Sequence, residues 1–168
     1  MSQLVPLNLH AWVEENRHLL RPPVGNKAIW SSNFLVMVVG GPNQRTDYHV
    51  NPTEELFFQV EGDIVLKVID DGQPRDIPIR QGEMFVLPAN VPHSPRRPAG
   101  TVGLVVEQAR PQGADDHMRW YCPKCGAVIH DAQFHLEDLG KQLKPIIERF
   151  NGSEELRTCK SCGTVYPA

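Results

Sequence analysis

The sequence has 168 residues, of which 40% are hydrophobic and 22% charged, and its formal net charge is −3. That length supports one full hydrophobic core with a small appendage and is too short for two ordinary domains. A charge this small gives no electrostatic footprint for nucleic acid or an anionic membrane. We therefore expect a small-molecule partner, no nucleic acid and no membrane.

The first twenty residues predict a helix and not a targeting segment. MSQLVPLNLHAWVEENRHLL lacks the basic start and continuous apolar run of a secretion signal, so we expect a cytoplasmic protein. Asn8 is a suitable helix cap, and the helix should reach about Leu20. It should end at RPPVGNK, because Pro22 and Pro23 cannot continue a helix interior.

Residues 28–108 have the pattern of an antiparallel β protein. Short runs rich in β-branched and aromatic residues alternate with turn residues, which favours a barrel or a sandwich. EGD at 61–63 and DDGQ at 70–73 are typical of hairpin turns. The predicted strands cover residues 34–39, 54–60, 63–70, 75–79, 83–88 and 102–108.

The composition changes near residue 118. The segment after it holds all four cysteines and a helical pattern, roughly 136–150, that we expect to break or restart at Pro145. We therefore expect residues 1–117 to form the main domain, with the N-terminal helix and a lid loop. Residues 118–168 should form an extension packed on that domain.

The stretch DYHVNPTEELFFQVEGDI, residues 47–64, places ionisable groups in an apolar strand. Side chains alternate between the two faces of a strand, so Glu54 and Glu55 cannot serve one site. The face of Glu55 also carries Phe57 and Gln59. Two polar groups around one aromatic ring are what a small cavity lined for chemistry would present.

Two spacings resemble the motifs of the cupin superfamily. Glu55 is followed after six residues by Gly62, and GEMFVLPANVPH runs from Gly82 through Pro88 to His93. The first spacing selects Glu55 over its neighbour. The resemblance implies a mainly β fold, a cupin-type, jelly-roll-like antiparallel β-barrel with a few helices.

The same resemblance implies a metal site formed by His49, Glu55 and His93. Two imidazoles and one carboxylate make a facial triad with open positions for non-haem Fe(II) and O2 chemistry. The pattern departs from the superfamily at two points. Asp47 stands where a histidine is usual, and five residues separate His49 from Glu55, one more than usual. Cupins without a metal also serve as sugar-binding or isomerase scaffolds, so the fold alone does not assign the chemistry.

Further segments resemble the bacterial 3-hydroxyanthranilate 3,4-dioxygenases over nearly the whole chain. They are RPPVGN, GGPNQRTDYH, PHSPRRP, VVEQARP and the two cysteine pairs. The resemblance implies that Fe(II) and O2 open the ring of 3-hydroxyanthranilate to 2-amino-3-carboxymuconate semialdehyde, which cyclises without enzyme to quinolinate. It also implies a homodimer, because members of that family commonly form one.

The resemblance assigns roles to several residues around the metal. Arg97 would clamp the substrate carboxylate bidentately, a geometry that lysine does not match. Glu107 would accept a hydrogen bond from the amine and is our candidate acceptor of the first substrate proton. Arg45 would bind the carboxylate or stabilise an oxygen species at the iron, and Asp47 would orient Arg45 or a ligand. A loop covering the pocket would contain Val24 and Asn26.

The cysteines form a second metal pattern. CPKCG at 122–126 and CKSCG at 159–163 place Cys122, Cys125, Cys159 and Cys162 in two knuckles that suit a tetrahedral four-sulfur site. A closed site of this kind is structural by default, with a redox dithiol pair as the alternative. The spacing does not separate Zn from Fe. The family resemblance implies a rubredoxin-like iron remote from the active centre.

Two other functions remain open at this point. One is a related ring-cleaving dioxygenase for another aminophenol or catechol carboxylate. The other is a cupin ligand or metal sensor with a zinc-ribbon tail, against which the lack of a basic patch or DNA-reading helix counts. The sequence does not specify whether the pathway is tryptophan breakdown, NAD synthesis or nitroaromatic degradation.

Overall fold

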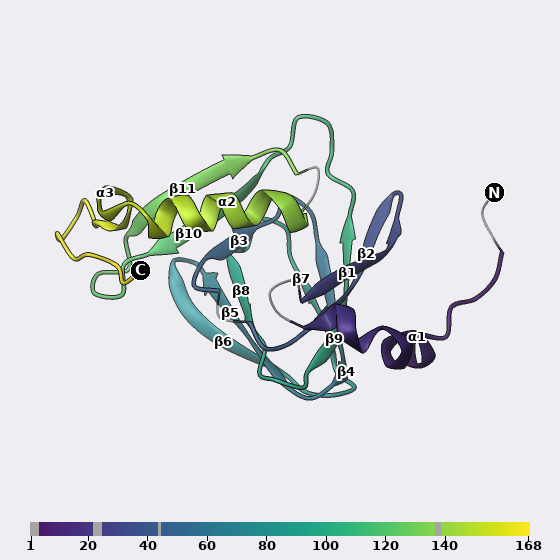
Figure 1. Cartoon of the computed structure of the whole chain (residues 1–168). Coiled ribbons are helices and arrows are strands. Elements are labelled where there is room, and N and C mark those ends of the chain that lie inside the picture. Colours follow the sequence, from purple (N-terminus) through teal and green to yellow (C-terminus); the bar gives the residue numbers. More distant parts are fainter. Residues whose placement is uncertain (1–3, 22–24, 44, 137–138) are drawn as a thin grey trace.

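A computed structural model describes residues 4–21, 25–43, 45–136 and 139–168 (Figure 1). In these ranges the strands form two antiparallel sheets. The five-stranded sheet has the order β1 (Asn26–Ser31), β2 (Phe34–Gly40), β9 (Val102–Gln108), β4 (Glu55–Glu61) and β7 (Met84–Leu87). The six-stranded sheet has the order β11 (Val128–Phe134), β10 (Asp116–Tyr121), β3 (Tyr48–Val50), β8 (His93–Arg96), β5 (Ile64–Asp70) and β6 (Gln73–Ile79).

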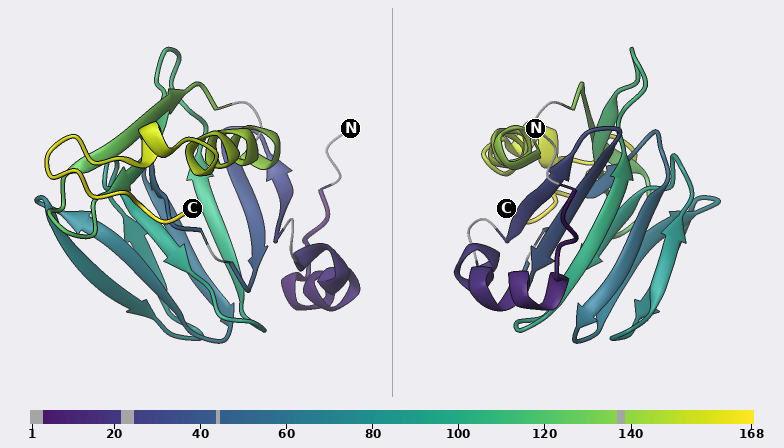
Figure 2. Two further views of the ribbon diagram at one scale, coloured as in Figure 1. Left: turned by 60° about the vertical axis from the view of Figure 1, so that its left-hand side comes forward. Right: turned by 90° about the vertical axis from the view of Figure 1, so that its right-hand side faces the viewer.

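The two sheets enclose one apolar core, and their arrangement can be followed in Figure 2. Along β4 and β5 buried and less buried side chains alternate, as expected for strands with one face inward. Phe57 and Val105 come from the five-stranded sheet and Leu66 and Val68 from the six-stranded sheet. The predicted antiparallel β architecture is confirmed, and each of the six predicted strands is present within a few residues of its predicted limits.

The hairpin turn predicted at 70–73 is confirmed, and its backbone is the one that its sequence requires. Between β5 and β6, Asp71 and Gly72 have φ angles of 46° and 77°, as a two-residue turn with positive φ at both positions demands. This turn sets the register that keeps the apolar residues of β5 and β6 on one face. The hairpin predicted at 61–63 is wrong. Gly62 has φ 65° and a tight turn is present, but it carries the chain from one sheet to the other, because β4 pairs with β7 and β9 and β5 pairs with β6 and β8.

The N-terminal helix is also confirmed. The Asn8 side chain accepts a hydrogen bond from the Ala11 amide at 3.0 Å, α1 covers Leu9–Asn16, and a 3₁₀ helix covers Arg17–Leu20. Val13 and Leu20 are buried against the five-stranded sheet. Gly40 permits this approach, since a Cβ there would lie 2.2 Å from the Leu20 carbonyl oxygen.

The C-terminal segment adds two strands and two helices, α2 (Leu139–Asn151) and α3 (Glu154–Arg157). Phe150 of α2 stacks on Trp120 of β10 with ring centroids 4.1 Å apart. The expected break at Pro145 is wrong, because α2 runs through it. A proline inside a helix removes one backbone hydrogen bond, and the burial of Leu143 and Phe150 on either side of it compensates for that loss. β10 begins at Asp116 and pairs with β3, so it joins this segment to the barrel sheet; the division at residue 117 remains a prediction.

We predict that Leu66→Ala lowers the free energy of unfolding by about 2–5 kcal/mol, because Leu66 is fully buried between the sheets. Urea denaturation measures this loss. The matched control is Leu7→Ala, since Leu7 is 56% exposed and its removal should change stability by roughly 0.5 kcal/mol or less. Equal losses in the two variants would contradict the assigned core.

Candidate active site

Three buried side chains converge between the two sheets. His49 on β3 and His93 on β8 are directly paired in the six-stranded sheet, and Glu55 begins β4 in the five-stranded sheet. One ligand atom from each lies within 4.8 Å of the others. The ring of Phe57 meets the His93 ring edge-on at 6.0 Å and forms an apolar wall beside them. The alternation along β4 turns Glu55 inward and leaves Glu54 exposed, as predicted.

The contact between His93 and Glu55 fits a bound cation. His93 Nδ1 lies 3.0 Å from the Val91 carbonyl oxygen, which can only accept, so the ring proton belongs on Nδ1 and leaves a lone pair on Nε2. That Nε2 faces Glu55 Oε2 at 3.0 Å, and Oε2 is buried without a hydrogen-bond partner among the described residues. Burial lowers the pKa of His93, but the Glu55 carboxylate outweighs it and raises that pKa overall. One positive charge shared by His93 Nε2 and Glu55 Oε2 would therefore stabilise this contact.

The His49 ring is held by a buried carboxylate. Its Nε2 lies 2.6 Å from Asp116 Oδ2, and Asp116 is fully buried at the start of β10. A carboxylate on one ring nitrogen fixes the tautomer, so the lone pair of His49 is on Nδ1. Burial lowers the pKa of His49 despite this carboxylate, which favours the neutral imidazole that a metal needs.

Arg45 and Asp47 form a partly buried ion pair at the edge of the site. Arg45 Nε donates to Asp47 Oδ1 at 3.1 Å, and a second Arg45 nitrogen contacts the other carboxylate oxygen. Asp47 is 1% exposed, whereas the Arg45 side chain is 30% exposed. Asp47 therefore holds Arg45, one of the two arrangements expected for it, and Arg45 retains access to solvent.

Arg97 is buried with part of its hydrogen-bonding capacity unused. Its Nη1 donates to Gln59 Oε1 at 2.9 Å, while Nε has no hydrogen-bond partner in the described part of the chain. Burial lowers the pKa of Arg97 to about 10, against the opposing effect of Glu55, so the guanidinium stays charged near neutral pH. Gly103 leaves room for it, since a Cβ there would lie 2.7 Å from Arg97 Nη1.

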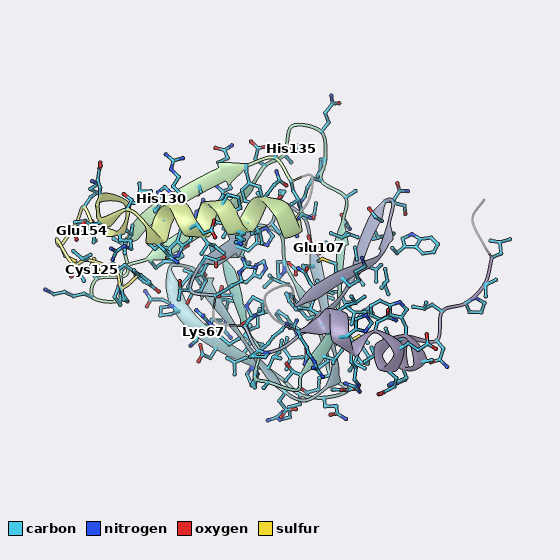
Figure 3. The ribbon with its side chains drawn as sticks, viewed as in Figure 1. Lys67, Glu107, Cys125, His130, His135 and Glu154 are labelled. Carbon is cyan, nitrogen blue, oxygen red and sulfur yellow. The ribbon has the colours of Figure 1, made fainter. Side chains whose placement is uncertain are left out.

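Glu107 lies opposite Glu55 across the β4–β9 pair. Its Oε2 accepts hydrogen bonds from Arg110 Nη2 at 2.7 Å and Asn51 Nδ2 at 3.4 Å. Burial and the Glu55 carboxylate raise the pKa of Glu107 to about 7, against the effect of Arg110. The side chain points into the barrel in Figure 3.

The structure thus brings most of the predicted site residues together, with two exceptions. Val24 lies outside the described residues. Asn26 is the first residue of β1, paired with Val39, and not part of a loop. Several neighbours escaped the sequence analysis, namely Asn51, Gln59 as a partner of Arg97, Gly103, Arg110 and Asp116. The signal that could have found Asp116 is the alternation in DHMRWY, where buried residues occupy every second position.

The four cysteines form a separate cluster. Their sulfur atoms lie within 4.8 Å of one another, and the Cys122–Cys162 and Cys125–Cys159 sulfurs are each 3.6 Å apart. Tetrahedral ligation at a metal–sulfur distance of about 2.3 Å places sulfurs about 3.8 Å apart. Gly126 and Gly163 supply the positive φ that closes each knuckle. Cys125 and Glu107 are well separated in Figure 3, so this cluster is remote from the triad.

The fold and the triad define the class of the protein: an antiparallel β-barrel with a buried His–Glu–His group that could hold a metal ion. Among solved structures, protein NMB1881 from Neisseria meningitidis has the same fold, with a TM-score of 0.50 and 23% identity over 62% of this chain and 100% of that chain.

The chain belongs to the 3-hydroxyanthranilic acid dioxygenase family, whose model matches residues 1–151. A relative named 3-hydroxyanthranilate 3,4-dioxygenase from Neurospora crassa is 56% identical over 95% of this chain and 89% of its own. One of the same name from Xanthomonas campestris is 55% identical over 97% of this chain and 93% of its own. The resemblance inferred from the sequence is confirmed.

We predict that Cys162→Ser removes one metal ion per chain and lowers the thermal unfolding midpoint. The cluster links residues 122–126 to 159–163, and losing roughly 3 kcal/mol would lower the midpoint by about 6–12 °C in a chain of this size. Metal analysis and calorimetry measure both effects. Ser161→Ala, in the same knuckle, is the control. Unchanged metal content in Cys162→Ser would contradict a four-sulfur site.

Proposed function

We propose that the protein uses Fe(II) and O2 to open the ring of 3-hydroxyanthranilate, giving 2-amino-3-carboxymuconate semialdehyde, which cyclises without enzyme to quinolinate. Membership of the family and the names of the two relatives support this reaction. The observation that carries it is the occurrence of a His–Glu–His cluster and a buried arginine with a free Nε inside one barrel. The first can hold a metal, and the second can take a carboxylate.

The ligands of the catalytic metal would be His49 through Nδ1, Glu55, and His93 through Nε2. Two neutral imidazoles and one carboxylate leave open positions, the arrangement typical of non-haem Fe(II) oxygenases. When bound, Fe(II) would hold the adjacent hydroxyl and amine of the substrate beside O2 and let electrons pass between them. The protein supplies the fixed geometry, because each imidazole has its other nitrogen occupied by Asp116 or the Val91 carbonyl.

Arg97 would bind the substrate carboxylate. Its Nη1 is engaged by Gln59, so the guanidinium edge that carries Nε is the one available for a second pair of hydrogen bonds. Arg45, held by Asp47 and partly exposed, would bind the same carboxylate or stabilise negative charge on oxygen. Arg97 favours a ligand with a negative charge over an uncharged ring, because a buried charge needs a partner.

Glu107 would recognise the amine. Within the described residues the hydrogen bonds of Glu107 go to Oε2, which leaves Oε1 to accept from the substrate's amine. A carboxylate in this position discriminates an amine or hydroxyl from a hydrogen or methyl group. Glu107 is also our candidate for the acceptor of the first substrate proton.

The buried charges suit a ligand with a single carboxylate. Among the described residues, four acidic side chains and three guanidinium groups surround the site: Asp47, Glu55, Glu107, Asp116, Arg45, Arg97 and Arg110. When all are ionised they carry one excess negative charge, and a divalent ion turns this into one excess positive charge. One substrate carboxylate then neutralises the site, which is the condition that burial favours.

We further propose that the four-cysteine cluster holds structural Fe or Zn and that the protein works in the cytoplasm, where thiols stay reduced. Among the described residues, no disulfide joins the four cysteines. In the described part of the chain, no helix has the length and apolar character to cross a membrane.

The experiment that tests this function is oxygen uptake by the Fe(II)-reconstituted protein on addition of 3-hydroxyanthranilate. We predict uptake in proportion to substrate and an absorbance from the semialdehyde. His49→Ala, Glu55→Ala and His93→Ala should each lower the rate by more than the roughly 10–100-fold typical of residues around a metal's ligands. Substrate binding without oxygen uptake in the wild-type protein would contradict the function and favour a sensor.

A second prediction concerns the carboxylate clamp. Arg97→Lys should weaken anaerobic binding of 3-hydroxyanthranilate roughly 10–100-fold, because a charged hydrogen bond contributes about 1.5–3 kcal/mol. Gly103→Ala should act in the same direction by displacing the Arg97 guanidinium. Isothermal titration measures both, with Arg96→Lys as the neighbouring control. If 2-aminophenol, which lacks the carboxylate but keeps the adjacent hydroxyl and amine, bound equally well, Arg97 would have no such role.

A third prediction concerns the homodimer, which we propose to form through the outer face of the five-stranded sheet. Val36, Val106, Leu56 and Val86 form one cross-strand row there, and Met84 and Val86 are 68% and 50% exposed. Light scattering should give twice the chain mass for the wild type and less for Val86→Lys. Val128→Lys, also at an exposed strand position but in β11, should remain dimeric. A monomeric wild type would contradict the proposal.

A further inference from the structure

A continuous path of buried charged groups connects Glu107 to His49. Arg110 Nη2 lies 2.7 Å from Glu107 Oε2 and also 2.7 Å from Asp116 Oδ2. Arg110 Nε lies 2.7 Å from Asp116 Oδ1, and Asp116 Oδ2 lies 2.6 Å from His49 Nε2. Every contact in the path is as short as a charge-assisted hydrogen bond.

Burial makes this path stiff. Asp116 is 0% exposed, and the side chains of Glu107, Arg110 and His49 are 2%, 5% and 8% exposed. Removing one partner from such a pair leaves an uncompensated charge in a medium of low dielectric constant. Each member therefore constrains the next, because none can turn toward water to find another partner.

Arg110 is also fixed to the barrel. Its Nη1 donates to the carbonyl oxygen of Gln108, the last residue of β9, at 3.0 Å. The same nitrogen lies 3.4 Å from Thr53 Oγ1. All five N–H groups of a guanidinium lie in one plane, so this anchor sets the directions of the other two edges. Lysine keeps the charge but has no planar fork to bridge two carboxylates.

We propose that Arg110 and Asp116 are positioning residues that couple the metal ligand His49 to the amine-binding Glu107. Asp116 would orient the His49 ring and increase its basicity, and Arg110 would fix Asp116 and Glu107 relative to each other. The proposal rests on the proposed function, because it assumes a metal at the triad. It adds a second group of residues whose effect reaches both the metal and the substrate.

The test measures Co(II) affinity by chelator competition, in protein whose cysteine cluster is already loaded with Zn(II). We expect Asp116→Asn and Arg110→Lys to raise the Co(II) dissociation constant about 10–100-fold, as is typical when the partner of a metal-binding histidine is altered. The matched control is Asp131→Asn. Asp131 contacts His117 Nδ1 and Arg119 Nε at 2.7 Å each, so it has the same His–Asp–Arg arrangement on the surface. Asp131→Asn should change the Co(II) dissociation constant less than twofold.

A second readout distinguishes coupling from a general loss of structure. Anaerobic binding of 3-hydroxyanthranilate to the Co(II) protein should weaken in Arg110→Lys and in Glu107→Gln. Only Arg110→Lys should also weaken Co(II) binding. Arg110→Lys and Asp116→Asn act on the same path. The double variant should therefore lose less free energy of Co(II) binding than the sum of the losses in the two single variants.

Co(II) affinities within twofold of wild type for both Asp116→Asn and Arg110→Lys, in proteins with native circular dichroism, would overturn the proposal. If Asp116→Asn does not fold, Arg110→Lys decides alone. If His49→Ala bound Co(II) as tightly as the wild type, the metal site itself would be wrong. The proposed function would then fail with it.

Discussion

The sheet register is the constraint on which the rest of the structure depends. In the six-stranded sheet it sets His49 directly beside His93, and in the five-stranded sheet it sets Glu55 opposite Glu107. A shift of one residue in either sheet would turn these side chains from the interior to the outer face. The triad therefore exists only because two independently registered sheets face each other. The turn at Gly62 carries the chain directly from the sheet that holds Glu55 to the sheet that holds the two histidines.

Once the register has brought these groups inside, their charges have to be balanced. The core that holds them is apolar, built on Phe57, Leu66 and Val105, so each buried carboxylate meets a guanidinium or an imidazole. Among the described residues near the centre, Glu55 Oε2 faces only the lone pair of His93 Nε2 and Arg97 Nε has no hydrogen-bond partner, so the first can take a cation and the second an anion. A metal ion and a carboxylate-bearing ligand would satisfy both, which makes the polar interior more stable when it is loaded.

Local patterns predicted much of this arrangement. Alternation in EELFFQV distinguished Glu55 from Glu54, and the turn residues located the strands on either side. The cysteine knuckles, whose spacing is encoded within five residues each, were recognisable as a cluster, which the structure brings together. These features depend on neighbours in sequence, and so a single sequence contains the information.

Other features depend on partners that lie far apart in the chain. Asp116 meets His49 across 67 residues, and Gln59 meets Arg97 across 38, and neither pairing leaves a local trace. β3 and β8 were not predicted because they are short and carry polar or proline residues, His49 and Pro95 among them. The segment from Arg110 to Asp116 was interpreted as a boundary between regions because it is polar and rich in turn residues. In the folded protein Arg110 and Asp116 of this segment face inward and connect the two sheets.

The most direct test of the central claim is to run the reaction with 3-hydroxyanthranilate under oxygen enriched in the heavy isotope and to analyse the product by mass spectrometry. Ring opening by a dioxygenase places one oxygen atom in the new carboxylate and one in the aldehyde, and the aldehyde oxygen leaves as water when the ring closes on the amine. The account predicts quinolinate carrying a single heavy oxygen atom. Quinolinate without the heavy atom, or consumption of oxygen with no ring-opened product, would contradict it.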